Sequence, residues 1–94
     1  MHGEYKMPGG KLIVADLEVR AGRLAEVSIS GDFFLEPDTA LATIDAALEG
    51  LDADCDEGAM ARAIQNALDD EVALYGISAQ AVAVAVRRAL ETRI

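Results

Sequence analysis

The chain has 94 residues, of which 17 are acidic and 8 are basic, and its formal net charge is −9. This length allows one domain with a modest core, and the acidity excludes a nucleic-acid-binding protein, which needs a basic surface. A single cysteine excludes an intrachain disulfide and indicates a reducing, cytoplasmic setting. Because no apolar run approaches the ~20 residues of a membrane span and the start lacks the layout of a signal peptide, we expect one cytoplasmic domain over residues 1–94 with no membrane partner.

Residues 11–20 and 23–33 are predicted to form a β-hairpin, because apolar and polar side chains alternate along much of both segments. Ala21-Gly22 supplies the turn between them, and Pro8-Gly9-Gly10 indicates a loop before the first strand. The residues expected to face the core are Leu17, Val19, Ala25, Val27 and Ile29.

The pairing of the two strands is predicted from charge. Arg20 opposite Glu26 gives a favourable cross-strand pair, whereas a shift by two residues would set Glu18 against Glu26. This register places Ile13 opposite Phe33. The loop before the first strand and the segment after the second are therefore expected at the same end of the hairpin.

Beyond Pro37 the apolar residues follow a helical period, and three helices are predicted. The first starts near Pro37 and stops at Gly50. The second starts near Asp56, and the third is capped by Ser78, while residues 72–75 fit either a continued helix or a short extended segment. The residues expected on the buried helical faces are Leu41, Ile44, Leu48, Met60, Ile64, Leu68, Val82, Val86 and Leu90. The order ββααα predicts an α+β domain, with an antiparallel hairpin or small sheet and about three helices packed on one face.

Three arginines lie close to the end of the sequence. Arg87, Arg88 and Arg93 fall in the last turn of the third predicted helix or just after it. Basic side chains are favourable there because they complement the negative end of the helix dipole, and we predict this structural role for them.

The sequence Gly9-Gly10-Lys11 has the residue types of a phosphate-binding loop but not its spacing. A P-loop has four residues between its glycines, a Ser or Thr after the lysine, and then a helix. Here Leu12 and a predicted strand follow the lysine, so an independent nucleotide site is not predicted. Two interpretations stay open: a tight turn with a solvated lysine, or a loop that presents Lys11 to a phosphate held by another chain.

No group of side chains in the sequence has the pattern of a metal site or a catalytic site. Asp52-x-Asp54-x-Asp56 resembles the start of a calcium loop, but the glycine and glutamate that an EF-hand requires further on are missing. We interpret this cluster as a solvated interhelical loop. Cys55 lies within it, where neighbouring carboxylates raise the pKa of a thiol, and His2, the single histidine, lies at a terminus expected to fray. We therefore predict no catalytic residue and no metal ligand.

Gly31-Asp32-Phe33-Phe34 contains both phenylalanines of the chain and lies where the strand pattern gives way to the helical one. In a strand, Phe33 and Phe34 point to opposite faces, so one ring can enter the core while the other needs cover elsewhere or stays exposed. The segment is either a strand end at which the glycine permits a bulge, or a surface whose exposed ring anchors a partner. We favour a partner interface formed by these four residues.

Three segments in combination resemble the C-terminal, accessory domain of lipoate–protein ligases: Lys6-Met7-Pro8-Gly9-Gly10-Lys11-Leu12, Ile29-Ser30-Gly31-Asp32-Phe33-Phe34-Leu35-Glu36-Pro37 and Leu48-Glu49-Gly50. The resemblance implies a free-standing small subunit that caps a separate catalytic subunit in a heterodimer. It also implies that this subunit is required for ATP-dependent activation of lipoate to lipoyl-AMP. ATP, Mg²⁺ and lipoate are then expected in the complex and not on this chain alone, and lipoyl-domain acceptor proteins are indirect partners.

The resemblance suggests roles for the two segments discussed above. Lys11, on a loop made flexible by Gly9 and Gly10, is expected to approach the site shared with the catalytic subunit, and residues 31–34 are expected to contact that subunit. A non-catalytic adaptor or scaffold with a fold like that of small iron–sulfur-assembly proteins is the alternative, although such scaffolds use several cysteines. An independent small enzyme is disfavoured, because the sequence offers no catalytic constellation.

Overall fold

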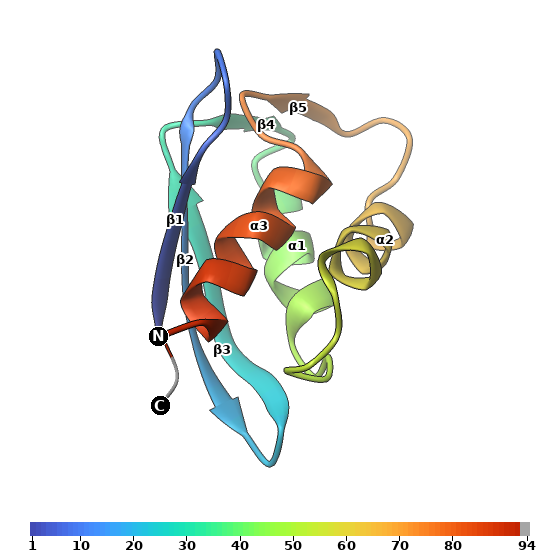
Figure 1. The fold of residues 1–94 in the computed structure, drawn as a ribbon. Coiled ribbons are helices and arrows are strands. Elements are labelled where there is room, and N and C mark those ends of the chain that lie inside the picture. The colour runs from blue at the N-terminus through green and yellow to red at the C-terminus, as the bar shows by residue number, and fades with distance from the viewer. Residues whose placement is uncertain (93–94) are drawn as a thin grey trace.

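The computed structural model describes residues 1–92, which combine two small sheets with three helices (Figure 1). In chain order the elements are β1 (His2–Lys6), β2 (Leu12–Arg20), β3 (Arg23–Gly31), β4 (Phe34–Glu36), α1 (Ala40–Leu48), α2 (Glu57–Ala67), β5 (Ala73–Tyr75) and α3 (Ala79–Leu90). The predicted α+β class is confirmed, with five strands in place of the two of the predicted hairpin. None of the helices within residues 1–92 has the length and apolarity that crossing a membrane requires.

Strands β1, β2 and β3 form an antiparallel sheet in that order. β2 and β3 are the predicted hairpin, and both residues of the Ala21-Gly22 turn have positive φ, 53° and 78°, which suits the twist of the flanking strands. The expectation that His2 lies at a frayed end is wrong. β1 pairs with β2 along its length, from His2 opposite Asp16 to Lys6 opposite Leu12.

The register predicted for β2 and β3 is also wrong. Arg20 lies opposite Arg23 and not opposite Glu26, because the chain reverses through only two residues. One extra residue in β3 then forms a bulge, where Glu26 has φ 50°, and beyond it Ile13 lies opposite Gly31, two residues short of the predicted partner. Arg20 and Glu26 still form an exposed ion pair, with 2.5 Å between nitrogen and oxygen. The ion pair between these two side chains therefore forms although their backbones are not opposite each other.

The bulge decides which side chains of β3 enter the core. Strict alternation predicts Ala25, Val27 and Ile29 on the inner face. With the extra residue, Leu24 is buried together with Val27 and Ile29, while Ala25 is only partly buried. Because full burial of a leucine side chain is worth about 1.5–3 kcal/mol, the exchange of an alanine for a leucine favours the bulged strand.

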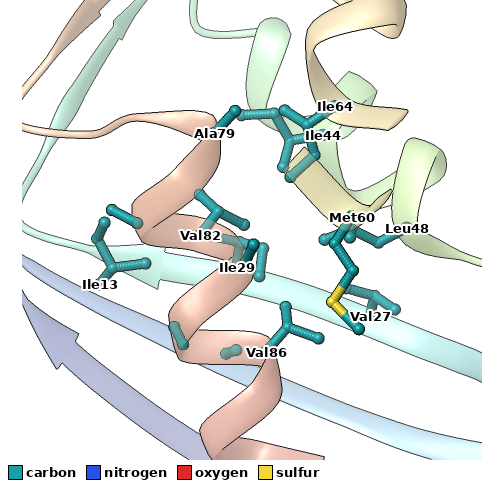
Figure 2. Packing of buried hydrophobic residues seen from close by; sticks show 14 of the residues in the cluster. Ile13, Val27, Ile29, Ile44, Leu48, Met60, Ile64, Ala79, Val82 and Val86 are labelled. Atoms are coloured by element: carbon teal, nitrogen blue, oxygen red, sulfur yellow. The ribbon is translucent and has the colours of Figure 1, made fainter. Parts of the chain in front are cut away.

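The three helices lie on one face of the main sheet in two layers (Figure 1). α3 crosses β1 and β2, α1 packs on β3, and α2 packs on α3 and α1 on the side away from the sheet. Side chains from β2, β3 and the three helices converge in one core (Figure 2). The largest fully buried side chains are Ile13, Ile44, Leu48, Met60, Ile64, Leu90, Val82 and Val86. The helical faces predicted to be buried are thus confirmed, with Leu41 and Leu68 at the margin of the core.

β1 and α3 approach each other closely because the facing residues are small. A β-carbon at Gly3 would lie 2.3 Å from the backbone nitrogen of Ala89 and 2.4 Å from the backbone oxygen of Ala85. These contacts are far shorter than two non-bonded atoms allow. Glycine is therefore required at position 3 for α3 to rest on β1.

The arginines at the end of α3 fasten the helix to its neighbours. Arg88 donates a hydrogen bond to the carbonyl oxygen of Glu4 at 3.0 Å, and its guanidinium carbon lies 5.0 Å from the ring centroid of Tyr5. Arg87 donates to a carbonyl oxygen in the α1–α2 loop at 3.2 Å. Both lie in the last turn of α3, where a positive charge is favourable, and Arg93 lies outside the described residues.

The outer edge of β3 is occupied by α1 and by the loop that follows it. The Asp45 carboxylate of α1 accepts a hydrogen bond from the Ile29 N–H at 3.0 Å. Leu24 donates its N–H to the Leu51 carbonyl oxygen at 2.9 Å and accepts from the Gly50 N–H at 2.8 Å. Burial raises the pKa of the Asp45 carboxyl, and the hydrogen bond from Ile29 opposes this rise. Although β3 is the last strand of its sheet, these backbone groups have partners.

Residues 73–75 are extended, which resolves the alternative left open by the sequence. β5 pairs antiparallel with β4 in a separate two-stranded sheet, and Phe34 lies opposite Tyr75. Gly76, with φ 74°, then turns the chain into α3. The hydroxyl oxygen of Ser78 accepts from the Ala81 N–H at 3.1 Å and caps this helix as predicted.

The remaining helix ends follow the predicted signals only in part. Asp56 caps α2, because its carboxylate accepts from the Ala59 N–H at 2.7 Å. α1 begins at Ala40 and not at Pro37, whose carbonyl oxygen instead accepts from the Ala40 N–H at 3.1 Å. Gly50, with φ 86°, follows the end of α1 as predicted.

Candidate functional site

The connection between β1 and β2 is a closed loop that ends at Lys11. The Gly10 N–H donates to the Met7 carbonyl oxygen at 2.9 Å, and the Met7 N–H donates to the Lys11 carbonyl oxygen at 3.3 Å. Gly9 has φ 67°, a conformation that glycine adopts with little strain. A strand follows the loop where a P-loop has a helix, and Lys11 is exposed. The loop between β1 and β2 therefore places an exposed lysine at this end of the sheet.

The end of β3 lies against the start of β2 because residue 31 is a glycine. A β-carbon at Gly31, where φ is 150°, would lie 2.1 Å from the Leu12 carbonyl oxygen and 2.9 Å from a ring carbon of Phe33. Phe33 packs against the core, whereas Phe34 is 60% exposed, so the two rings differ in burial as the alternation predicts. Asp32, between the glycine and the two rings, is exposed.

The exposed ring of Phe34 has a neighbour that sequence reasoning missed. Tyr75, opposite it in the β4–β5 pair, is 52% exposed, and the two ring centroids lie 5.7 Å apart at an interplanar angle of 42°. Within residues 1–92, these two rings and Met1 are the large apolar side chains that remain exposed. The sequence allowed residues 72–75 to be extended, and this was the signal that could have pointed to Tyr75. It does not show that these residues pair with β4.

Lys11 lies beside the turn that follows β5. A β-carbon at Gly76 would lie 2.5 Å from the Lys11 Cγ, so the lysine stem rests on the backbone of that turn. β2 pairs with β3 next to Gly31, and β4 pairs with β5 at Tyr75. The β1–β2 loop, the β3–β4 connection and the β5–α3 turn therefore meet at the top of Figure 1. We call this region the aromatic end; it consists of residues 9–11, 31–34 and 75–76. The structure thus brings the sequence-predicted site residues together and adds Tyr75 and Gly76 to them.

The cysteine lies at the other end of the hairpin. Cys55 is in the α1–α2 loop, which is attached to the β2–β3 turn by a hydrogen bond of 2.9 Å from the Ala53 N–H to the Gly22 carbonyl oxygen. Burial raises the pKa of the Cys55 thiol, and the nearby Asp52 and Asp56 carboxylates raise it further. The thiolate, which is the nucleophilic form, is therefore disfavoured at neutral pH.

The histidine lies between two carboxylates on the outer face of the sheet. The ring nitrogens of His2 are 2.6 Å from a Glu4 carboxylate oxygen and 2.7 Å from an Asp16 carboxylate oxygen. Both hydrogen bonds raise the pKa of His2, and the bond to Glu4 has the larger effect. Asp52 and Asp56 in the α1–α2 loop accept hydrogen bonds from backbone N–H groups, at 2.8 Å and 2.7 Å. Within residues 1–92, His, Cys, Asp and Glu side chains form no group of three or more that is arranged to hold a metal ion.

Two of the surface hollows formed by residues 1–92 are small. One of about 180 Å³ is lined by residues at the start of α1 and the end of α2, including Thr43 and Leu68. Another of about 260 Å³ lies on the outer face of the sheet beside Glu18. Pockets that enclose a drug-sized ligand measure roughly 300–1,000 Å³. Both hollows fall below this range, so neither is large enough to enclose a drug-sized ligand.

No protein-family model matches the sequence, and no curated protein matches it. The fold is similar to that of a chain in a solved structure described as an archaeal lipoylation system, a bipartite lipoate protein ligase and its E2 lipoyl domain from Thermoplasma acidophilum. The superposition has a TM-score of 0.70, covers 93% of this chain and 98% of that chain, and relates residues that are 23% identical. The chain therefore shares its fold, over nearly its whole length, with a component of that archaeal lipoylation system.

Proposed function

We propose that this chain is the accessory subunit of a two-chain lipoate–protein ligase. It caps a catalytic subunit, forms a heterodimer with it, and is required for ATP-dependent activation of lipoate to lipoyl-AMP. The fold likeness to a chain from a bipartite lipoate protein ligase system supports this, since it covers 93% of this chain and 98% of that one, so the two are similar in size. The three sequence segments that resemble the accessory domain of such ligases point to the same role.

The aromatic end carries this proposal. Its two exposed rings, Phe34 and Tyr75, lie beside an exposed lysine, while the histidine and the cysteine lie elsewhere. Aromatic side chains are typical anchors of a partner interface, because they bury a large area at little cost in conformational entropy. A neighbouring lysine can offer its charge to a phosphate held by the partner. This composition suits a subunit that completes an active site on another chain.

The activation step joins lipoate to AMP. A carboxylate oxygen of lipoate attacks the α-phosphorus of ATP and forms a new oxygen–phosphorus bond. The bond between the α-phosphorus and the oxygen that bridges to the β-phosphate breaks, and pyrophosphate leaves. The catalytic subunit holds ATP, Mg²⁺ and lipoate, and the accessory subunit closes over them, which fixes the reactants and keeps water out. Lys11 approaches the phosphates, where its ammonium stabilises developing negative charge. Because this chain has a net charge of −9, recognition of acidic lipoyl-domain acceptors falls to the catalytic subunit.

The direct test is lipoyl-AMP formation by a ligase catalytic chain that lacks its own C-terminal domain. Lipoate-dependent exchange of labelled pyrophosphate into ATP is measured with the catalytic chain alone, with this chain alone, and with both. We expect exchange only when both chains are present. Equal exchange by the catalytic chain with and without this one would contradict the accessory role and favour the adaptor alternative.

Replacing Lys11 by alanine is expected to slow lipoyl-AMP formation by the reconstituted pair roughly 10- to 100-fold, because a charge directed at the phosphates is lost. The matched control is Arg62→Ala, which removes an equal charge from an exposed position on α2. Thermal melts of both variants check that each chain is folded. If Lys11→Ala and Arg62→Ala pairs react as fast as the wild type, the lysine has no part in the shared site.

A further inference from the structure

We propose that Gly76 is a positioning residue for Lys11: the backbone of the β5–α3 turn supports the lysine stem and directs its ammonium toward the partner. Gly76 lies 65 positions after the lysine in sequence (76 minus 11) and has φ 74°. A β-carbon there would lie 2.5 Å from the Lys11 Cγ, 3.2 Å from its Cβ and 3.8 Å from its Cδ. The aliphatic stem of the lysine therefore lies directly on the space that a side chain at position 76 would fill.

Lys11 needs such support because its own loop gives little. Around Gly9 there is open space, with no atom within 4 Å of where a β-carbon would stand. Within residues 1–92 the ion pairs involve His2 and Arg20 with their carboxylates, and Lys11 takes part in none of them. A lysine stem has many rotamers of similar energy, so a surface along one side of it reduces the directions in which the ammonium can point.

The turn at Gly76 is itself held firmly on both sides. Before it, Tyr75 is paired with Phe34 in the β4–β5 sheet. After it, Ile77 is buried in the core, and Ser78 caps α3 by accepting from the Ala81 N–H at 3.1 Å. The support under the lysine is therefore a fixed part of the fold. The same turn carries an exposed aromatic ring, so a partner that docks on this ring meets the lysine in a defined position.

The test compares two glycines with similar positive φ, 74° at Gly76 and 78° at Gly22. Gly76→Ala places a methyl group on the Lys11 stem and forces the lysine into another rotamer. Gly22→Ala, in the β2–β3 turn, introduces alanine at φ 78° with no atom within 4 Å of the new methyl group. The two substitutions share the left-handed strain of a non-glycine residue, which lowers the equilibrium constant for folding roughly tenfold. Only the first displaces the lysine.

The first readout is the stability of this chain alone, which does not depend on the proposed function. Gly76→Ala is expected to lower the denaturation midpoint more than Gly22→Ala does, because of the added contact with Lys11. In a Lys11→Ala background most of this excess is expected to disappear, since the Cγ that meets the methyl group is gone and only the Cβ, at 3.2 Å, remains. An excess of undiminished size in this background would overturn the contact as its cause.

The second readout is lipoyl-AMP formation by the reconstituted pair, and this part rests on the proposed function. Gly76→Ala is expected to slow the reaction roughly tenfold, less than Lys11→Ala because the charge is kept, while Gly22→Ala leaves the rate unchanged. Added to Lys11→Ala, Gly76→Ala is expected to cause no further loss.

The two readouts separate the possible failures. Wild-type rates for Gly76→Ala together with slow rates for Lys11→Ala would overturn the positioning role. A further loss when Gly76→Ala is added to Lys11→Ala would overturn it as well, because the glycine would then act by another route. Wild-type rates for Lys11→Ala would show that the lysine has no role in lipoyl-AMP formation. Gly76 would then have no role in the reaction through the lysine.

Discussion

Replacing Gly3 by alanine is expected to lower the free energy of unfolding by about 3 kcal/mol, the upper end of the usual cost of overpacking a core. The new methyl group would lie 2.3 Å from the Ala89 nitrogen and 2.4 Å from the Ala85 oxygen. Both are main-chain atoms of α3, so no side chain can rotate to make room. The helix must instead move away from β1, which opens its contacts with both β1 and β2.

Urea denaturation of the isolated chain measures this effect, with an expected fall in the midpoint of roughly 2 M. Gly58→Ala is the matched control, because position 58 lies in the first turn of α2 and a β-carbon there meets its nearest atoms at 3.4 Å. This control is expected to raise stability by up to about 1 kcal/mol, since alanine is the better helix former. Similar midpoints for the two variants would show that α3 does not rest on β1 as closely as described.

If the chain docks on a catalytic subunit as proposed, replacing Phe34 and Tyr75 by alanine is expected to weaken this binding severely. Each aromatic anchor of an interface is worth about 2 kcal/mol, so each substitution raises the dissociation constant roughly 30-fold. Phe34 is 60% exposed and Tyr75 is 52% exposed in the free chain, so its own stability changes little. The two losses are not expected to add fully, because the rings lie 5.7 Å apart and share contacts.

Isothermal titration of each variant into the catalytic subunit measures the affinity, and thermal melts of the isolated chains measure folding. Gln65→Ala, at an exposed position on α2, serves as a control that is expected to bind like the wild type. Phe33→Ala is expected to differ from both variants by a clear loss of stability, because its ring packs against the core. Unchanged affinity in the folded Phe34→Ala and Tyr75→Ala variants would exclude the aromatic end as the docking surface.

The parts of the fold that could be predicted are those decided by neighbours in sequence. Ala21-Gly22 forms the expected two-residue turn, and Asp56 and Ser78 cap their helices through their own side chains. β1 escaped prediction because its inward residues are Gly3 and Tyr5, which give a weak apolar pattern on a short strand. Its stability comes from pairing with β2 and from contacts with α3, which lies more than 70 residues away in the chain (79 minus 6 is 73).

The register of the hairpin could not be predicted from charge because β3 contains a bulge. The pairing of Arg20 with Glu26 was expected to fix the register, but the bulge lets these side chains meet while their backbones are not opposite. The error of two residues moves the partner of Ile13 from Phe33 to Gly31 and leaves both at the same end of the sheet. The proximity of the glycine-rich loop to residues 31–34 could therefore be predicted despite the wrong register.

The rest of the aromatic end could not be predicted from the sequence. Tyr75 reaches Phe34 only because β5 pairs with β4, and these strands are three residues each, too short for a clear alternating pattern. Gly76 turns the chain into α3, but its contact with Lys11 depends on where the whole C-terminal half packs. Such contacts follow from the tertiary fold and leave no mark in local residue patterns.

The occupied edge of β3 has a consequence for how this chain behaves at high concentration. An open edge strand is the template on which a second molecule can add a strand and begin a fibre. In β3 the Ile29 N–H is bound by Asp45, and both backbone groups of Leu24 are bound by the loop after α1. Another molecule can reach these groups only after α1 and its loop have come away from the sheet. The rate of fibre formation through this edge is therefore set by how often α1 detaches, and not by how often two native molecules collide.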